Sequence, residues 1–250
     1  MEIEMLNEPT LEKLKTLRLD GMTAAWTEQQ KNSDIGALAF DERFGMLVEA
    51  ESMYRENKRI TRSLKEAKLR LNEACIEAVD FPAKRELDKS VIRQLATCRW
   101  LQEHQAVLVT GATGTGKSFI ACALANQACR RGFRAMYRRA PRLFDEMKIA
   151  RADGSYRNLL ARIARVDVLV LDDFAVAPVN DQERSDLLEV MEDRYGLRST
   201  IVTSQLPPAD WHDYLADPTL ADAICDRLLN NAHRLVLKGP SRRKEKEVNQ

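Results

Sequence analysis

The sequence contains no apolar run long enough to cross a membrane, which takes about 20 apolar residues. It begins with the acidic stretch Met1-Glu2-Ile3-Glu4 and lacks the basic-then-apolar layout of a signal peptide. Its five cysteines are scattered and form no CxxC pair, and its three histidines lie far apart. We therefore expect neither a disulfide framework nor a zinc site, and we expect a protein of the reducing cytoplasm.

The chain as a whole has no excess of positive or negative charge, but some of its segments do. Lysine and arginine number 39 against 38 aspartate and glutamate residues, so the formal net charge is +1. Residues 1–50 hold ten acidic and five basic residues, whereas residues 51–70 hold seven basic and three acidic ones. A nearly neutral total thus hides a basic segment that suits an anionic partner.

The first eighty residues predict helices. Thr10 is a suitable N-cap for the first helix, and a second helix is expected over 40–50 and beyond. An apolar stripe at helical spacing follows, formed by Met53, Ile60, Leu64, Ala67, Leu71 and Ala74. Lys58, Arg62 and Lys65 fall on the opposite face of that helix. The segment therefore predicts a helix with a core side and a basic side.

Pro82 ends this pattern, because proline disfavours helix in the residue before it. We place a domain boundary there, with a small all-helical N-terminal domain for DNA or partner binding over 1–80. The domain over 81–250 ends in a short charged tail. Its short apolar runs, which alternate with helical patterns, cover 106–110, 134–137, 166–171, 200–203 and 235–237. This alternation predicts an α/β fold, with a central parallel sheet flanked by helices.

Residues 111–118 read GATGTGKS and match the phosphate-loop pattern G-x-x-x-x-G-K-[ST] at every fixed position. Glycines let successive backbone N–H groups wrap phosphate oxygens, and the next helix presents its positive end to them. Lys117 would bind the β- and γ-phosphates of ATP, and the Ser118 hydroxyl would ligate Mg²⁺. A strand-like run before the loop and a helical one after it disfavour a chance glycine-rich turn. The predicted nucleotide-binding residues are Gly111, Ala112, Thr113, Gly114, Thr115, Gly116, Lys117, Ser118 and Phe119.

A second acidic motif follows the apolar run 168–171, which ends in Asp172 and Asp173. A buried strand that carries acids at its carboxyl end suits the Mg²⁺ site of a phosphate-loop NTPase. We expect Asp172 to hold the metal, directly or through water, and Asp173 to act as general base. The alternative is a pair of solvated turn residues, which would leave the metal without this ligand.

Together these motifs resemble the AAA+ ATPases of the helicase-loader clade, and nearly the whole chain resembles the IstB family, the helper ATPases of bacterial insertion sequences. The N-terminal motifs favour IstB over DnaC-type loaders. They are LRLDGM at 17–22, FDERF at 40–44, EAE at 49–51 and NKRI at 57–60, with Leu64-Lys65. The motifs of the second domain are LDDF at 171–174, TSQLP at 203–207 and DRL at 226–228.

The resemblance implies roles for two further residues. Gln205 matches the polar sensor-1 residue that reads the γ-phosphate or its water; the alternative is a turn side chain. Arg227 matches the arginine finger of this clade, which acts on the nucleotide of a neighbouring subunit. The alternative for Arg227 is a local ion pair with Asp222 or Asp226.

The sequence departs from the AAA+ pattern at two places. Asp173 stands where many AAA+ enzymes have glutamate. The chain also ends soon after the last expected strand, so we expect no C-terminal lid domain. Arg242 and Arg243 in the tail either approach the nucleotide or are ordinary tail charges.

Basic residues suggest contacts with DNA. Lys58, Arg59, Arg62, Lys65 and Lys68 would contact phosphates along the basic helix, unless that face is merely solvated. The resemblance implies that the helix after the second strand of the ATPase domain faces a central channel. It therefore adds Arg138, Arg139, Arg142 and Lys148. No zinc finger, RNP pattern or clear helix-turn-helix occurs, which predicts weakly sequence-specific binding of duplex DNA.

The resemblance implies a Mg²⁺-dependent, DNA-stimulated ATPase that assists transposition. Subunits would assemble on duplex DNA with ATP between them, select a target site and stimulate a partner transposase. Hydrolysis would then reset the assembly. One alternative is a DnaC-like replicative helicase loader, which would prefer single-stranded DNA. Another is a small-molecule kinase, whose turnover would be indifferent to DNA.

Overall fold

The computed structural model describes residues 2–82 and 85–242. The chain divides into two compact units, Met1–Arg62 and Ser63–Gln250. The division therefore lies earlier than the boundary expected near residue 80. Residues 63–80 belong to the second unit because they bury apolar side chains in its core, namely those of Ala67, Leu69, Ala74 and Val79.

The first unit consists of helices. They are α1 (Glu2–Thr16), α2 (Asp20–Lys31), the short 3₁₀ helix η1 (Ser33–Ala37) and the part of α3 (Phe40–Ala67) up to Arg62. The first helix already begins at Glu2, so Thr10 lies inside it and the N-cap expected there is wrong. The helix expected over 40–50 does continue, and it runs through the basic segment as one helix as far as Ala67.

Only part of the apolar stripe behaves as expected. Ala67 is buried and Ile60 and Leu64 are half-buried, whereas Met53 is 56% exposed. The helix ends at Ala67, and Lys68 takes a positive φ of +51° immediately after it. Leu71 and Ala74 therefore lie beyond the helix, because a residue in the left-handed conformation ends the helical backbone.

Two contacts join α2 to α3 within the first unit. A Cβ on Gly21 would lie 2.6 Å from the carbonyl oxygen of Ala50 and 2.7 Å from Cα of Glu51, so this crossing requires glycine. The buried carboxylate of Glu51 accepts hydrogen bonds from the backbone N–H of Gly21, at 2.8 Å, and of Met22, at 3.1 Å. Glu51 thereby satisfies two amides at the N-terminus of α2 that have no partner within the helix.

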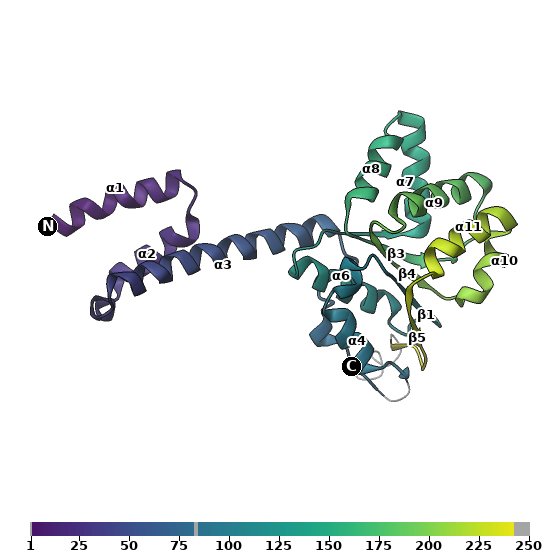
Figure 1. The fold of residues 1–250 in the computed structure, drawn as a ribbon, viewed down its shortest axis with the longest axis horizontal. Coiled ribbons are helices and arrows are strands. Elements are labelled where there is room, and N and C mark those ends of the chain that lie inside the picture. The colour runs from purple at the N-terminus through teal and green to yellow at the C-terminus, as the bar shows by residue number, and fades with distance from the viewer. Residues whose placement is uncertain (1, 83–84, 243–250) are drawn as a thin grey trace. The chain divides into compact units, whose positions relative to one another are not determined.

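The second unit is built on a five-stranded parallel sheet with the order β2-β3-β4-β1-β5 (Figure 1). All five strands predicted from the apolar runs are present. Their bounds are β1 (Ala106–Gly111), β2 (Ala135–Arg139), β3 (Val168–Phe174), β4 (Ser199–Ser204) and β5 (Ala232–Leu237). The parallel α/β arrangement predicted from the sequence is confirmed.

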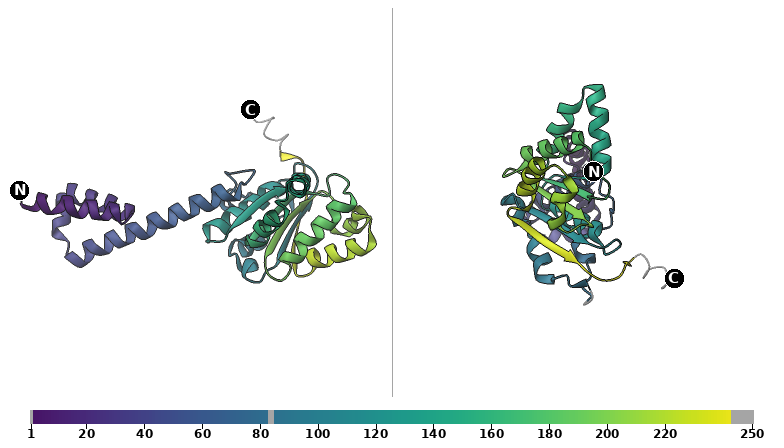
Figure 2. Two further views of the ribbon diagram at one scale, coloured as in Figure 1. Left: turned by 90° about the horizontal axis from the view of Figure 1, so that it is seen from above. Right: turned by 90° about the vertical axis from the view of Figure 1, so that its right-hand side faces the viewer.

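Helices cover both faces of the sheet (Figures 1 and 2). Val107 and Val109 of β1 pack with the side that carries α4 (Lys89–Ala96), α5 (Arg99–Gln102) and α6 (Lys117–Arg130). Leu108 points to the opposite side, because successive side chains of a strand alternate between faces. That side carries α7 (Ala140–Asp153), α8 (Tyr156–Arg165), α9 (Asp181–Arg194), α10 (Trp211–Leu215) and α11 (Pro218–Leu229).

Short connections complete the described chain. The 3₁₀ helices η2 (Ile76–Ala78) and η4 (Pro208–Asp210) precede α4 and α10 respectively. Within the described residues, no helix is both long and apolar enough to span a bilayer. Because all five strands run parallel, their carboxyl ends meet at one edge of the sheet, where ligands of open α/β sheets bind.

Candidate functional site

The phosphate loop lies where its sequence motif predicts, between β1 and α6. Gly111 has φ of +145°, and a Cβ there would overlap the carbonyl oxygen of Leu237. Gly116 has φ of +97° and precedes the first residue of α6. The Thr115 hydroxyl donates to the Ala112 carbonyl at 2.8 Å and closes the turn. The loop therefore leads into a helix N-terminus whose first N–H groups can bind an anion.

Lys117 is folded into this loop. Its side chain is buried, and Nζ donates to the carbonyl oxygens of Gly111 at 2.8 Å and Ala112 at 2.9 Å. A buried ammonium needs such acceptors to offset the loss of hydration. These contacts hold the positive charge within the loop, as binding of phosphate oxygens requires.

Ser118 and Asp172 lie together at the carboxyl edge of the sheet. The Ser118 hydroxyl donates to Oδ1 of Asp172 at 2.9 Å, and Asp172 is completely buried. A hydroxyl and a carboxylate are ligands that Mg²⁺ accepts, and Mg²⁺ usually needs only one or two protein carboxylates besides water and phosphate. No group of three or more acidic, histidine or cysteine ligands occurs among the described residues. The Ser118–Asp172 pair therefore fits Mg²⁺ held jointly with a nucleotide.

Other donors surround Asp172 that the sequence motifs did not reveal. The hydroxyls of Tyr137 and Thr203 both donate to its carboxylate, and Arg70 NH1 lies 3.6 Å from Oδ2. Burial, and then the hydrogen bond to Asp172, raises the pKa of Tyr137, so its phenol stays protonated and donates. These three donors come from three separate segments of the chain, which explains why no local pattern identified them.

Asp173 adopts an unusual backbone conformation beside this carboxylate. Its φ is +56°, and its N–H donates to the Thr203 hydroxyl at 3.1 Å. Its carboxylate accepts a hydrogen bond from Nε of Arg139 at 2.8 Å and lies 3.6 Å from NH1 of Arg70. Arg139, which we expected to face a DNA channel, is thus bound to the predicted general base.

Gln205 lies next to the phosphate loop, at the end of β4. Its Oε1 accepts a hydrogen bond from the Thr113 hydroxyl at 2.8 Å. Strands β4 and β1 are neighbours in the sheet, so their carboxyl ends bring the two loops together. This position is consistent with a residue that senses phosphate.

Arg227 lies on α11 and has a local partner. NH2 donates to Glu192 of α9 and NH1 to the Ala223 carbonyl, both at 2.9 Å. The acid is therefore neither Asp222 nor Asp226, the two partners considered from the sequence. Arg227 also lines a surface pocket with Arg194 and Arg198. Its action on a neighbouring subunit stays a prediction.

A second cluster of charges borders the phosphate loop. Arg242 donates its backbone N–H to the Gly114 carbonyl at 3.0 Å, and its guanidinium pairs with Asp80. Buried Arg85 also pairs with Asp80, at 3.0 Å, and its NH2 lies beside Gly116. The structure thus places Arg242 at the loop, while Arg243 lies outside the described residues.

The remaining predicted DNA contacts lie on both units. In the first unit, exposed Lys58 and Arg59 form ion pairs with Asp20 at 3.6 Å and Glu56 at 3.5 Å, respectively; Arg62 is also exposed. In the second unit, Lys65, Lys68, Arg142 and Lys148 are exposed. Arg138 pairs with Glu146 at 2.9 Å. A pocket of about 500 Å³, called the basic pocket below, is lined by Lys68, Arg70, Tyr137, Arg138, Arg139, Arg142 and Glu146.

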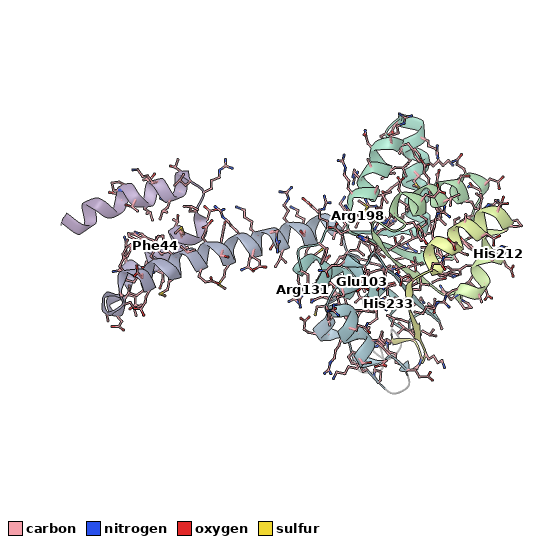
Figure 3. All side chains as sticks on the ribbon, viewed as in Figure 1. Phe44, Glu103, Arg131, Arg198, His212 and His233 are labelled. Carbon is pink, nitrogen blue, oxygen red and sulfur yellow. The ribbon has the colours of Figure 1, made fainter. Side chains whose placement is uncertain are left out.

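The histidines and cysteines take part in other contacts. His212 Nε2 lies 3.3 Å from Asp222 and His233 Nε2 lies 2.6 Å from Gln105, at separate places in the second unit (Figure 3). Burial raises the pKa of Cys122 to about 11, so this thiol, which lies on the phosphate-loop helix, stays protonated at neutral pH. Neither feature adds a nucleophile to the site.

Comparison with other sequences finds similar proteins for nearly the whole length of the chain. The family model described as "IstB-like ATP binding protein" matches residues 12–250. A Sinorhizobium fredii protein named for ATP binding in an insertion sequence is 44% identical over 240 residues, which cover 96% of this chain and 98% of that protein. The protein named for ATP binding in insertion sequence IS21 of Pseudomonas aeruginosa is 30% identical, with coverage of 98% and 90%.

Solved structures show the same fold at low sequence identity. The DnaC helicase loader has a TM-score of 0.56 and 19% identity, covering 66% of this chain and 97% of that chain. DnaI has a TM-score of 0.58 and 21% identity, with coverage of 66% and 92%. These similarities establish an AAA+ phosphate-loop fold for the second unit.

Proposed function

The chain belongs to the family of IstB-like ATP-binding proteins, and on this premise we propose that it is an ATP-dependent, DNA-binding helper of transposition. The observation that carries the proposal is the hydrogen bond from Ser118, the last residue of the phosphate-loop motif, to Asp172 on β3. It unites the two predicted metal ligands at the loop where the phosphates would bind. The names of the relatives, which combine ATP binding with insertion sequences, support the transposition role.

Each residue of the site has a role in the proposed hydrolysis of ATP. The loop 111–119 and Lys117 bind the phosphates, and Ser118 and Asp172 hold Mg²⁺. When bound, Mg²⁺ supplies positive charge that offsets the charge of the phosphate oxygens. Asp173 accepts the proton of the attacking water, and Gln205 positions that water. Before Asp173 can act, Arg139 must withdraw, because its Nε occupies the carboxylate oxygen Oδ2 of Asp173.

Assembly on DNA is the second part of the proposal. ATP would bind between adjacent subunits, with Arg227 of one subunit reaching the nucleotide of the next. Lys58, Arg59, Arg62, Lys65 and Lys68, together with Arg138 and Arg142, would contact duplex phosphates. The first unit would provide DNA or partner contacts, and the second unit would provide the ATPase. A bacterial cytoplasm supplies the ATP, the DNA and the partner transposase.

Light scattering in solution tests this function. The mass of the protein is measured with duplex DNA and ATP, ADP or no nucleotide, at low and moderate salt. Large assemblies that need both ATP and duplex, and that weaken with salt, are expected because phosphate contacts release counterions. A monomer under every condition would contradict the assembly and the trans role of Arg227.

A comparison of DNA forms separates the alternatives. A strong preference for single-stranded over duplex DNA would favour a helicase loader. Turnover of ATP that is indifferent to DNA, with no change in mass, would favour a small-molecule kinase. The proposed helper should prefer duplex DNA and turn over ATP faster in its presence.

A further inference from the structure

One buried cation of the second unit has hydrogen-bond donors without acceptors. Arg85 is only 3% exposed, and its NH1 donates to the Asp80 carbonyl oxygen at 3.2 Å and to the Asp80 carboxylate at 3.0 Å. Within the described part of the chain, Nε and NH2 of Arg85 have no hydrogen-bond partner. A buried donor without a partner costs free energy, and the cost is larger when the donor is charged. A ligand that supplies acceptors would remove this cost.

The unpaired donors of Arg85 lie directly beside the phosphate loop. A Cβ on Gly116 would overlap NH2 of Arg85, so only glycine lets the guanidinium come this close. Arg85 also lines a pocket of about 150 Å³, together with Thr115 of the loop and the two prolines Pro82 and Pro240. Unpaired donors, the phosphate loop and space for a ligand therefore meet at one place.

Positive charge exceeds negative charge around this pocket. The guanidinium groups of Arg85 and Arg242 share one carboxylate, that of Asp80. Lys238 also lines the pocket, so the lining carries three cations and one carboxylate. Burial, and then the charge of Arg242, lower the pKa of Arg85, as expected for a cation that is incompletely compensated. An anionic group would complete the cluster.

The position of the cluster selects one end of a bound nucleotide. The cluster lies at the carboxyl end of β5, whereas the basic pocket lies at the carboxyl end of β2, and β1, which leads into the phosphate loop, lies between β4 and β5. The groups proposed to act at the γ-phosphate, Asp172, Asp173 and Gln205, belong to β3 or follow β4. The γ-phosphate would therefore face β3 and β4, and the phosphate next to the ribose would face β5 and Arg85.

We propose that Arg85 binds the α-phosphate of the nucleotide through Nε and NH2, while its NH1 stays on Asp80. The inference rests on the proposed function and deepens it, because it assigns a residue to the part of ATP that ADP shares. Guanidinium groups bind phosphate oxygens with two parallel hydrogen bonds, and Nε with NH2 forms such a pair of donors. The α-phosphate displaces no existing partner of these two nitrogens.

The segment after β5 covers this place in the free protein. The backbone N–H of Arg242 donates to the Gly114 carbonyl at 3.0 Å, and a Cβ on Gly114 would overlap the side chain of Ser241. The ion pair that holds the segment, between Arg242 and Asp80, joins side chains that are 37% and 45% exposed. Solvent weakens such a pair, so residues 239–242 can move aside when the α-phosphate enters.

Full-length Arg85→Met protein tests the inference, because methionine packs in buried positions without charge or donors. Thermal unfolding measures the stability of the free protein. Calorimetric titration measures the affinity for ADP, for a non-hydrolysable ATP analogue and for the two diastereomers of ADPαS, in which sulfur replaces one oxygen of the α-phosphate. Arg234→Met, at an exposed position on β5 outside the pocket lining, is the matched control.

Arg85→Met should unfold at the wild-type temperature or above it, because an incompletely paired buried cation is removed. Its affinities for ADP and for the ATP analogue should fall by the same factor, about 10- to 100-fold, because both ligands carry the α-phosphate. The wild type should bind one ADPαS diastereomer about fivefold more weakly than ADP, since sulfur is a weak acceptor, and the variant should lose this discrimination. Arg234→Met should match the wild type in every measurement.

Arg85→Lys is the second variant if Arg85→Met does not fold. It keeps the positive charge but loses the paired donors of the guanidinium. It should therefore bind ADP about tenfold more weakly than the wild type and no longer distinguish the ADPαS diastereomers.

Three outcomes would overturn the inference. Arg85→Met could bind ADP as tightly as the wild type, or the wild type could bind ADP and both ADPαS diastereomers equally. A variant that unfolds at a lower temperature, yet keeps the wild-type discrimination between diastereomers, would show that Arg85 is a structural residue only. A wild-type protein that binds no nucleotide at all would instead contradict the proposed function, so the two failures are distinguishable.

Discussion

At the scale of single residues, Gln205 and Asp172 show how the site depends on polar contacts. Asp172 is completely buried, yet hydroxyls of Ser118, Tyr137 and Thr203 donate to it. A buried carboxylate without such donors would be strongly disfavoured. Gln205 is exposed and has its hydrogen bond with Thr113 of the phosphate loop. Asp172 is thus held in place before any ligand arrives, while Gln205 remains able to turn towards one.

Gln205→Ala should slow hydrolysis more than it weakens nucleotide binding. If the amide positions water only in the transition state, kcat should fall by about 10²-fold while ATP affinity changes less than about threefold. Steady-state turnover and titration with a fluorescent nucleotide measure the two effects. Thr113→Val, which removes only the hydrogen bond, should give a smaller loss of kcat. Weaker ATP binding with unchanged kcat would show that Gln205 is not a sensor.

At the scale of elements, the crossing of α2 and α3 depends on Gly21. Gly21→Ala places a methyl group against the backbone of Ala50 and Glu51, so it should destabilise the first unit by about 1–3 kcal/mol. Gly45→Ala on α3 is the control, because a Cβ there meets nothing within 4 Å. It should be neutral or stabilise by up to about 1 kcal/mol through helix propensity. Hydrogen exchange in α2 should accelerate in the first variant only.

The contact between α2 and α3 should also become less stable at low pH, because Glu51 is then protonated. Burial alone would raise the pKa of Glu51, but hydrogen bonds from Arg55, Met22 and Gly21 outweigh it and lower the pKa below the ordinary 4.5. The unfolded chain then binds the proton more readily, so the stability from Glu51 is complete above about pH 4.5 and lost as pH falls below it. Denaturant titrations of wild type and Glu51→Gln at several pH values measure this difference.

The Glu51→Gln variant removes the charge of Glu51 and so tests its contribution to stability. It should be less stable at pH 7 by about 1–3 kcal/mol, because the two amides of α2 lose a charged acceptor. The gap between the proteins should narrow as pH falls through the acidic range. A constant gap at all pH values would contradict the role of the Glu51 charge.

At the scale of the whole molecule, the site is predicted to be completed by a second copy of the chain. Arg227→Ala should lower ATP turnover by about 10³-fold or more while ATP still binds. A mixture of Arg227→Ala with Lys117→Ala should recover turnover, because one subunit supplies the arginine and the other the nucleotide. A mixture as inactive as its components would argue against a trans finger.

Glu192→Gln provides the matched control for Arg227. It removes the ion-pair partner, found at 2.9 Å, and leaves the arginine in place. Because the pair is partly solvated, it should contribute only about 0–1 kcal/mol to stability. Turnover should therefore remain near the wild-type level. A loss equal to that of Arg227→Ala would show that the local ion pair, rather than the finger, matters.

Much of the second unit could be predicted from the sequence, because its signals are local. The loop 111–118 is one contiguous motif, and each of the five strands is a short apolar run. The helices of the first unit were predicted less well. The helix at Glu2 began earlier than the Thr10 N-cap suggested, and the stripe continued past the helix end at Ala67. Spacing alone does not reveal a left-handed residue such as Lys68.

The sequence by itself thus determined the family, the parallel sheet and the pairing of a phosphate loop with an acidic strand end. Only the tertiary structure decided which residues meet there. Arg70 and Arg139 reach Asp172 and Asp173 from distant segments, and Arg194 is buried in the core with its guanidinium bound to backbone carbonyls. The physical reason is that periodicity reports the local backbone and its buried face, whereas these contacts depend on how the chain folds back across the sheet.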